Sequence, residues 1–198
     1  MTDPVAYLRS RGVEAIRATE LGGGVSNRVW LVETPRERLV LKQALGRLRV
    51  EEEWLSDRAR VFRESAALKA LAPCLPAGSV PLVLFEDARE FAFAMTAAGP
   101  ESANWKDLLL AGDAREDTAE TVGRLLARIA TATWEKPDWE REFRDQTVFH
   151  QLRVDPYYRF TAARHPAQAS HFERVMAESS ARRVCLVHGD WSPKNFLV

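Results

Sequence analysis

Hydrophobic and polar positions alternate along much of the first half of the chain. The segments NRVWLVET (residues 27–34) and ERLVLKQA (residues 37–44) are aliphatic or β-branched runs on either side of Pro35, a pattern typical of a β-hairpin. Two further runs, SVPLVLFED (residues 79–87) and EFAFAM (residues 90–95), flank a short polar turn. The pattern therefore predicts two pairs of strands before residue 100.

One helix is predicted between these strand pairs. The segment SDRARVFRESAALKALA (residues 56–72) has apolar residues at helical spacing. Ser56 and Asp57 are good N-cap residues and Pro73 ends the pattern. We expect a helix that begins at Ser56 or Asp57 and stops before Pro73.

The hydrophobic period changes to 3.6 residues beyond Gly99 and Pro100. NWKDLLLAG (residues 104–112) predicts a short helix closed by Gly112, and residues 117–133 predict a longer amphipathic helix. The residues on its apolar face are Val122, Leu125, Leu126, Ile129 and Thr133.

Two more helical patterns, near residues 141–152 and 167–180, precede a final loop that we expect to lie between two short strands. The order is a β-rich part with one helix, a hinge, and then a helical part. This order predicts an α+β fold of two lobes, with residues 1–97 forming the first and residues 98–198 forming the second.

Composition limits the possible partners. The 198 residues contain 28 Lys plus Arg and 28 Asp plus Glu, so the formal net charge is zero. Such a chain has no overall field that would attract nucleic acid or an anionic membrane. No apolar stretch is long enough for a membrane span, and we expect a soluble cytoplasmic protein with neither kind of partner.

A glycine-rich segment, LGGGVSNRVW, lies before the first predicted hairpin. Backbone amides at Gly22, Gly23 and Gly24 could approach an anion closely, and Ser26 adds a hydroxyl group. The same residues could form a plain turn between strands. The segment is no Walker loop, because no Gly-Lys-Ser/Thr follows it.

Lys42 and Glu64 are charged residues in apolar surroundings. Lys42 lies within the strand pattern LVLKQAL, where an ammonium group is costly unless an anion is close. Glu64 shares a helical stripe with Val61 and Leu68, and a carboxylate there needs a cation. One ion pair would explain both, although Lys42 could also reach water at a sheet edge and Glu64 could bend outward.

The segment LVHGDWSPKNFLV contains His-Gly-Asp followed by an asparagine five residues after the aspartate. Asp190 and Asn195 therefore share one polar loop, where side chains can converge on a ligand. Simple turn chemistry is the alternative, since both residues favour turns.

These features appear along the chain in the order that phosphoryl transfer from a nucleotide requires. Backbone amides and Lys42 would hold the phosphates, and Glu64 would hold Lys42. Asp190 would orient an acceptor hydroxyl and take its proton, and Asn195 would give an oxygen ligand to Mg²⁺.

At these motifs the chain resembles the aminoglycoside phosphotransferases and their relatives, a branch of the protein-kinase-like superfamily. The motifs are LVLKQAL, RVFRESAAL, NWKDLLLAG and the His-Gly-Asp loop, and the stretch from Lys42 to Glu64 is also similar to methylthioribose kinases. The resemblance implies ATP and Mg²⁺ as cofactors, with Lys42 on the ATP phosphates, Asp190 as catalytic base and Asn195 as metal ligand. It also implies that Met95, Thr96 and Ala97 form the adenine hinge and that His188 braces the loop. Lys194 could face either the phosphates or solvent.

The resemblance also sets an expectation about completeness. Relatives carry a second metal-binding aspartate on the strand after the loop, whereas this chain ends at Val198. We therefore expect an incomplete second lobe and an ATP-dependent phosphotransferase, acting on a hydroxyl of an aminoglycoside-like molecule, a sugar or an amino alcohol, that turns over little or not at all in this form. The alternatives are a catalytically dead nucleotide-binding or interaction module and a non-functional fragment.

Overall fold

The computed structural model describes residues 1–22, 24–49 and 55–198. The chain forms two compact units, residues 1–99 and residues 100–198. The boundary expected from the sequence, between residues 97 and 98, lies two residues earlier. Each unit is described below by itself.

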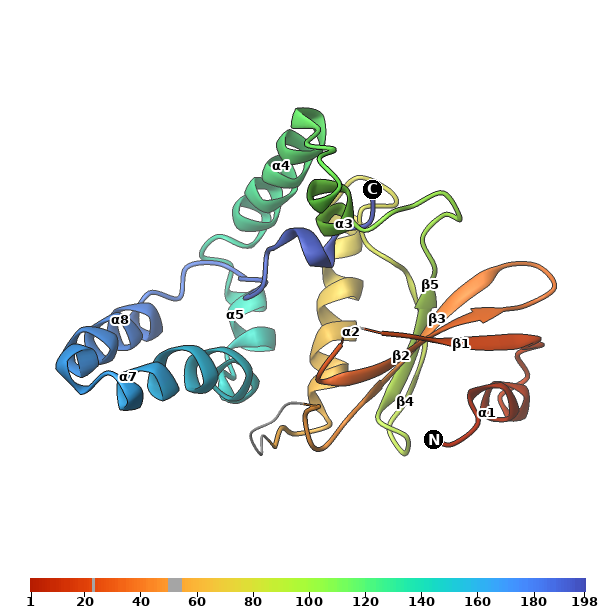
Figure 1. Cartoon of the computed structure of the whole chain (residues 1–198), viewed down its shortest axis with the longest axis horizontal. Coiled ribbons are helices and arrows are strands. Elements are labelled where there is room, and N and C mark those ends of the chain that lie inside the picture. Colours follow the sequence, from red (N-terminus) through yellow and green to blue (C-terminus); the bar gives the residue numbers. More distant parts are fainter. Residues whose placement is uncertain (23, 50–54) are drawn as a thin grey trace. The chain divides into compact units, whose positions relative to one another are not determined.

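Unit 1 is built on one antiparallel sheet (Figure 1). The strands lie in the order β1-β2-β3-β5-β4, and every neighbouring pair is antiparallel. The predicted hairpin is confirmed, with Trp30 opposite Leu41. The strands are β1 Arg17–Leu21, β2 Asn27–Glu33, β3 Arg38–Ala44, β4 Val83–Asp87 and β5 Ala92–Thr96.

Side-chain alternation divides β3 between two faces of the sheet. Leu39 and Leu41 belong to one apolar cluster, and Ala44 belongs to another. Since successive side chains in a strand point to opposite faces, Lys42 lies on the face of Ala44 and of its β5 partner Phe93. The strand pattern therefore places the ammonium group of Lys42 on the second face.

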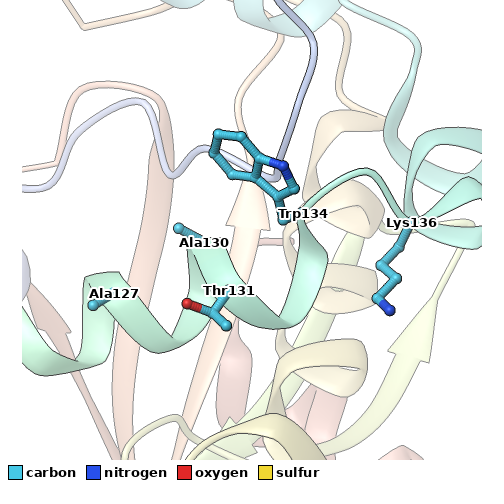
Figure 2. A pocket seen from close by; sticks show the side chains of 5 residues that line it. All are labelled: Ala127, Ala130, Thr131, Trp134 and Lys136. Carbon is cyan, nitrogen blue, oxygen red and sulfur yellow. The ribbon is translucent and has the colours of Figure 1, made fainter.

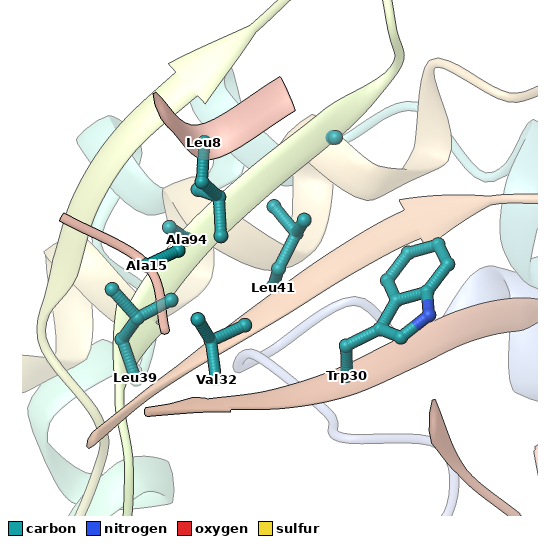
Figure 3. Packing of buried hydrophobic residues seen from close by; sticks show 8 residues of the cluster. Leu8, Ala15, Trp30, Val32, Leu39, Leu41 and Ala94 are labelled. Atoms are coloured by element: carbon teal, nitrogen blue, oxygen red, sulfur yellow. The ribbon is translucent and has the colours of Figure 1, made fainter. Parts of the chain in front are cut away.

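The first face carries the larger cluster of buried side chains. Helix α1 (Pro4–Ser10), which the sequence pattern did not predict, adds Leu8 to it. Figure 3 shows Leu8 beside Leu41 and Ala94, with Trp30 further along β2. The buried members are Leu8, Ala15, Trp30, Val32, Leu39, Leu41, Ala92 and Ala94.

Helix α2 (Arg60–Leu71) packs against the second face through Val61, which contacts Phe93 and Ala44. Burial of Phe93 contributes about 1.5–3 kcal/mol relative to an exposed ring. Helix α2 is followed by a 3₁₀ turn, η1 (Ala72–Cys74), which contains the predicted proline stop.

The expected start of α2 was wrong by about three residues. The carboxylate of Asp57 accepts a hydrogen bond from the amide of Ala59, which closes a turn rather than a helix. The carbonyl oxygens of Ser56 and Asp57 accept hydrogen bonds from the side chain of Arg60. Residues 57–59 form bonds of the tighter i to i+3 kind, such as Phe62 N to Ala59 O at 3.0 Å. The regular helix therefore begins at Arg60.

Unit 2 is mainly helical. The predicted helices at residues 104–112 and 117–133 are confirmed as α3 (Trp105–Leu110) and α4 (Glu116–Thr133), and Gly112 has a φ of +89° after α3. The remaining elements are α5 Pro137–Phe143, α6 Thr147–Phe149, the π-helical η2 His150–Arg159, α7 Phe160–Arg164, the 3₁₀ turn η3 Pro166–Gln168, α8 Ala169–Ala181 and the 3₁₀ turn η4 Pro193–Asn195.

Two expectations for unit 2 were wrong. The helix expected at residues 141–152 is interrupted at residues 144–146, and a new helical run, from α6 through η2 to α7, continues to residue 164 with Pro156 inside it. The apolar run before the final loop, residues 185–187, lies in no strand, although every one of its residues is described. After the loop, Leu197 forms only an isolated bridge with Asn104. Within the described ranges no helix is both long and apolar enough to cross a bilayer.

A surface ion cluster on β1 predicts one acid-dependent change in stability. Glu20 accepts hydrogen bonds from Arg28 and Arg49, and these bonds lower the pKa of its carboxyl to about 2. Because the folded-state pKa is depressed, the carboxylate stabilises unit 1 above the pKa of the unfolded chain, near 4.5, and this contribution is lost as pH falls towards 2. Glu20→Gln should remove that dependence, at a cost of less than about 1 kcal/mol at pH 7 because the cluster is half exposed.

Urea denaturation of both proteins between pH 7 and pH 2.5 measures the difference. The exposed Glu14→Gln is the matched control and should follow the wild type at every pH. A constant gap between Glu20→Gln and wild type over the whole pH range would contradict the assignment.

Candidate active site

The glycine-rich segment is the loop between β1 and β2. Gly23 lies outside the described residues. A Cβ atom on Gly22 would meet no atom within 4 Å, and one on Gly24 would lie 3.5 Å from the carbonyl oxygen of Asn27. Neither glycine has a positive φ angle. Neither the packing nor the backbone conformation therefore requires glycine at positions 22 and 24. The open space beside Gly22 leaves its backbone accessible to a ligand.

Lys42 and Glu64 form the ion pair that the sequence suggested. Lys42 Nζ lies 2.5 Å from Glu64 Oε1, with the lysine side chain 18% exposed and the glutamate side chain 38% exposed. The period of two along β3 and of 3.6 along α2 brings the two groups to the same face of the sheet. An ammonium group has three donors, and Glu64 takes one of them among the described residues, so the others can serve an anion.

Arg60 is a buried residue of this region that the sequence analysis missed. Its guanidinium group donates to the carbonyl oxygens of Leu45 at 2.8 Å and of Ser26, and it also binds two carbonyl oxygens before α2. Burial lowers the pKa of Arg60, an effect partly offset by the charges of Asp57 and Glu64. One side chain thus connects the end of the glycine-rich loop, the end of β3 and the start of α2.

The expected adenine hinge lies at the end of β5. Met95 is opposite Val40 in the sheet, and the amide of Thr96 donates to Leu82 O at 2.9 Å. The amide of Ala97 donates to Arg38 O at 3.4 Å. Because Ala97 bonds to Arg38 and Ala44 bonds to Phe91, the alternation of the ladder also pairs the amide of Met95 with Val40, so all three expected hinge amides are already used within unit 1.

The His-Gly-Asp loop of unit 2 folds into a tight turn. Gly189 has a φ of +75°, a conformation that favours glycine, and η4 follows with Asn195 at its last position. The side-chain amide of Asn195 donates to the backbone oxygen of Asp190 at 2.7 Å. This bond brings together the two residues that the motif predicts to act together.

Two cations contact the Asp190 carboxylate. Lys194 Nζ lies 3.0 Å and Arg153 Nη2 lies 3.2 Å from Asp190 Oδ2, while the Ser192 hydroxyl donates to Oδ1 at 3.2 Å. Partial burial raises the pKa of Asp190, but Lys194, Asn195 and the charge of Arg153 outweigh this effect and leave the pKa below its usual value. Asp190 is therefore ionised at neutral pH and able to accept a proton. Lys194, left open by the sequence, faces this carboxylate.

Aromatic rings and α3 support the loop. The amide of Asp190 donates to His188 Nδ1 at 3.2 Å, in agreement with the bracing role expected for His188. Trp191 packs edge-on against Phe196, with 4.8 Å between ring centroids, and Phe196 packs against Trp105 of α3. The loop is thus held through both its backbone and its side chains.

A separate pocket lies along the C-terminal half of α4 (Figure 2). Its lining contains none of the residues expected to act in catalysis or binding. The lining residues are Ala127, Ala130, Thr131, Trp134 and Lys136.

Comparison with known proteins decides the family. The model of the phosphotransferase enzyme family (APH) matches residues 17–198. The chain belongs to this family. The resemblance to aminoglycoside phosphotransferases, and with it the protein-kinase-like superfamily, is thereby confirmed. The predicted α+β class is also confirmed, with the strands in unit 1 and helices dominating unit 2.

Individual relatives are more distant. A methylthioribose kinase of Exiguobacterium sibiricum is 31% identical over 132 residues, which cover 64% of this chain and 33% of that kinase. Among solved structures, a spectinomycin phosphotransferase in complex with ADP and spectinomycin matches with a TM-score of 0.48 and 13% identity, over 94% of this chain and 61% of the other. The chain therefore matches one third of the length of the curated relative.

The donor set of unit 2 is compatible with a partial Mg²⁺ site. Among the described residues the side-chain oxygen of Asn195 accepts no hydrogen bond, because the amide nitrogen makes the contact to Asp190. An amide oxygen of this kind is a ligand that Mg²⁺ accepts. No group of three or more His, Cys, Asp or Glu side chains suited to a metal occurs in the described part of the chain. Phosphate oxygens and water would have to supply most ligands, as in other nucleotide-dependent sites.

Proposed function

We propose that this chain contains the nucleotide-binding and catalytic-loop parts of an ATP-dependent kinase that phosphorylates a hydroxyl group of a small molecule. The observation that carries the proposal is the ion pair between Lys42 and Glu64 in unit 1. Membership of the phosphotransferase enzyme family supports it.

Unit 1 would bind the nucleotide. Lys42 keeps two ammonium donors for phosphate oxygens, and Glu64 fixes the direction of the lysine side chain. Backbone amides around Gly22 and Gly24, together with the hydroxyl of Ser26, would add neutral donors. The adenine ring would lie against Met95 to Ala97.

Unit 2 would supply the catalytic base. The acceptor hydroxyl would give its proton to Asp190 as its oxygen bonds to the γ-phosphorus, and the bond from that phosphorus to the ADP oxygen would break. Asn195 would hold Mg²⁺ through its side-chain oxygen. Mg²⁺, when bound, offsets the negative charge of the phosphates.

For the acceptor, we propose only a chemical class. The relative that aligns at 31% identity is a methylthioribose kinase, which favours a sugar hydroxyl, while aminoglycoside-like molecules and amino alcohols remain candidates through the family. A cytoplasmic location is part of the proposal, because ATP is the phosphoryl donor.

Lys42→Met should weaken ATP binding by the 198-residue chain about 10- to 100-fold, because it removes charged hydrogen bonds to phosphate. The affinity for adenosine should stay unchanged, since adenosine has no phosphate. Titration with a fluorescent ATP analogue, in competition with ATP and with adenosine, measures both affinities.

Lys69→Met is the matched control. Lys69 lies on α2 and pairs with Glu86 at 2.9 Å, so its loss removes an ion pair of unit 1 that involves neither Lys42 nor Glu64. Equal ATP affinities for wild type and Lys42→Met would refute the phosphate role of Lys42.

Turnover is the second readout. It is measured for the 198-residue chain and for a form extended past Val198 with family sequence, using sugars, aminoglycosides and amino alcohols as acceptors. Tight ATP binding without transfer in either form would favour a nucleotide-binding module over a kinase.

A further inference from the structure

Arg153 is the residue outside the predicted motifs that makes the most direct contact with the candidate base. It lies in η2, whose π-helical winding extends over residues 150–159. Segments of π-helix are uncommon and often occur at functional sites. Arg153 is 37 positions before Asp190, and no local motif marked it in the sequence.

The guanidinium group of Arg153 binds the loop at two points. Nε donates to Gly189 O at 2.6 Å, and Nη2 donates to Asp190 Oδ2 at 3.2 Å. Nη1 donates to the carbonyl oxygen of Leu152 at 2.8 Å, which fixes the guanidinium group to its own helix. Because a guanidinium group is planar and rigid, these contacts fix a backbone oxygen and a carboxylate oxygen relative to each other.

Gly189 is pressed against the same helical run. A Cβ atom at this position would lie 3.4 Å from a ring carbon of Phe149 and 3.7 Å from Cγ of Arg153. Phe149 and Arg153 therefore pack against Gly189, the residue directly before Asp190.

Lys194 makes a different kind of contact with the same carboxylate. Its side chain is 53% exposed, comes from the loop itself and has Asp190 as its one ion-pair partner among the described residues. Arg153 is 32% exposed and is held by two carbonyl oxygens in addition to the carboxylate. Of the two cations, Arg153 has the geometry of a fixed support.

We propose that Arg153 is the positioning residue of the candidate base: it holds Oδ2 of Asp190 and the Gly189 backbone, so that Oδ1 is directed at the acceptor hydroxyl. The inference rests on the proposed kinase function for the role of Asp190. Among the residues that the structure describes, Oδ1 accepts only the long bond from Ser192, so it keeps a lone pair for the acceptor's proton.

Two variants test the role of the Arg153 guanidinium group. Arg153→Lys retains the charge but loses the rigid double contact, and Arg153→Gln retains hydrogen-bond donors but loses the charge. Arg159→Lys is the matched control, because Arg159 lies in the same helical segment and pairs with Asp155 on the surface.

The first measurement is amide hydrogen exchange in the 198-residue chain. In Arg153→Lys the amide of Asp190, which donates to His188 Nδ1, should exchange about 5- to 20-fold faster, while the melting temperature of the chain and the exchange of the unit 1 sheet stay unchanged. Arg159→Lys should leave loop exchange within about twofold of wild type. Unchanged loop exchange in both Arg153 variants would overturn the proposal.

The second measurement is turnover in the extended form. Both Arg153 variants should lower kcat about 10- to 100-fold with an unchanged ATP affinity, and they should have little further effect when Asp190 is already asparagine. Faster loop exchange with an unchanged kcat would reduce Arg153 to a structural support and overturn the positioning role. Turnover that does not respond to Asp190→Asn would instead refute the proposed function, which separates the two failures.

Discussion

Asp190→Asn is expected to slow phosphoryl transfer about 10²- to 10⁴-fold and to leave ATP affinity within about twofold of wild type. Asparagine has nearly the same shape as aspartate but cannot take a proton from the acceptor hydroxyl. Nucleotide affinity should persist, because the proposed phosphate contacts lie in unit 1, at Lys42 and the glycine-rich loop. Steady-state kinetics of the extended form at saturating ATP measure the rate, and a fluorescent nucleotide measures the affinity.

The contrast with another aspartate of unit 2 makes this test specific. Asp138→Asn removes the same charge from an exposed pair with Arg141 and should not change the rate. Asp190→Asn also leaves Arg153 and Lys194 without their carboxylate, so a melting curve must show that the loop variant still folds. A correctly folded Asp190→Asn protein with the wild-type rate would exclude Asp190 as the base.

Several parts of this site could be predicted because the relevant signal is periodic and local. Lys42 and Glu64 stood out as charges within apolar patterns of period two and 3.6, and the same periods place them on one face of the sheet. The loop from Asp190 to Asn195 is specified by six consecutive residues. In both cases residues close together in the sequence determine most of the arrangement of the side chains.

Other parts depend on contacts between distant segments. Arg153 meets Asp190 across 37 positions, and Arg60 meets Ser26 across 34 positions, so neither contact leaves a local pattern. Ser56 and Asp57 resemble helix caps, but their carbonyl oxygens bind the Arg60 side chain and the helix starts later. The apolar residues 185–187 resemble a strand, yet no strand lies beside them among the described residues, and a strand needs a partner to form.

Arg60→Met is expected to lower the free energy of unfolding of unit 1 by about 3–5 kcal/mol. The Arg60 side chain is nearly inaccessible, at 6% exposure, and donates to four carbonyl oxygens from three segments. Methionine fills a similar volume but donates nothing, so buried acceptors at Ser26 and Leu45 lose their charged donor. The free energy of unfolding of Arg60→Lys should lie between those of the wild type and Arg60→Met, because an ammonium group cannot reach all four oxygens.

Hydrogen exchange of the β2 and β3 amides is the suitable probe for this prediction, because it reports on unit 1 alone, whereas the six tryptophans of the chain report on both units. Arg17→Met, which breaks an exposed pair with Glu33, is the control and should leave the exchange of the sheet close to that of the wild type. Since Arg60 joins the glycine-rich loop to the helix that carries Glu64, its loss should also weaken ATP binding under conditions where unit 1 remains folded. An Arg60→Met protein whose sheet exchanges as slowly as that of the control would show that the three segments hold together without it.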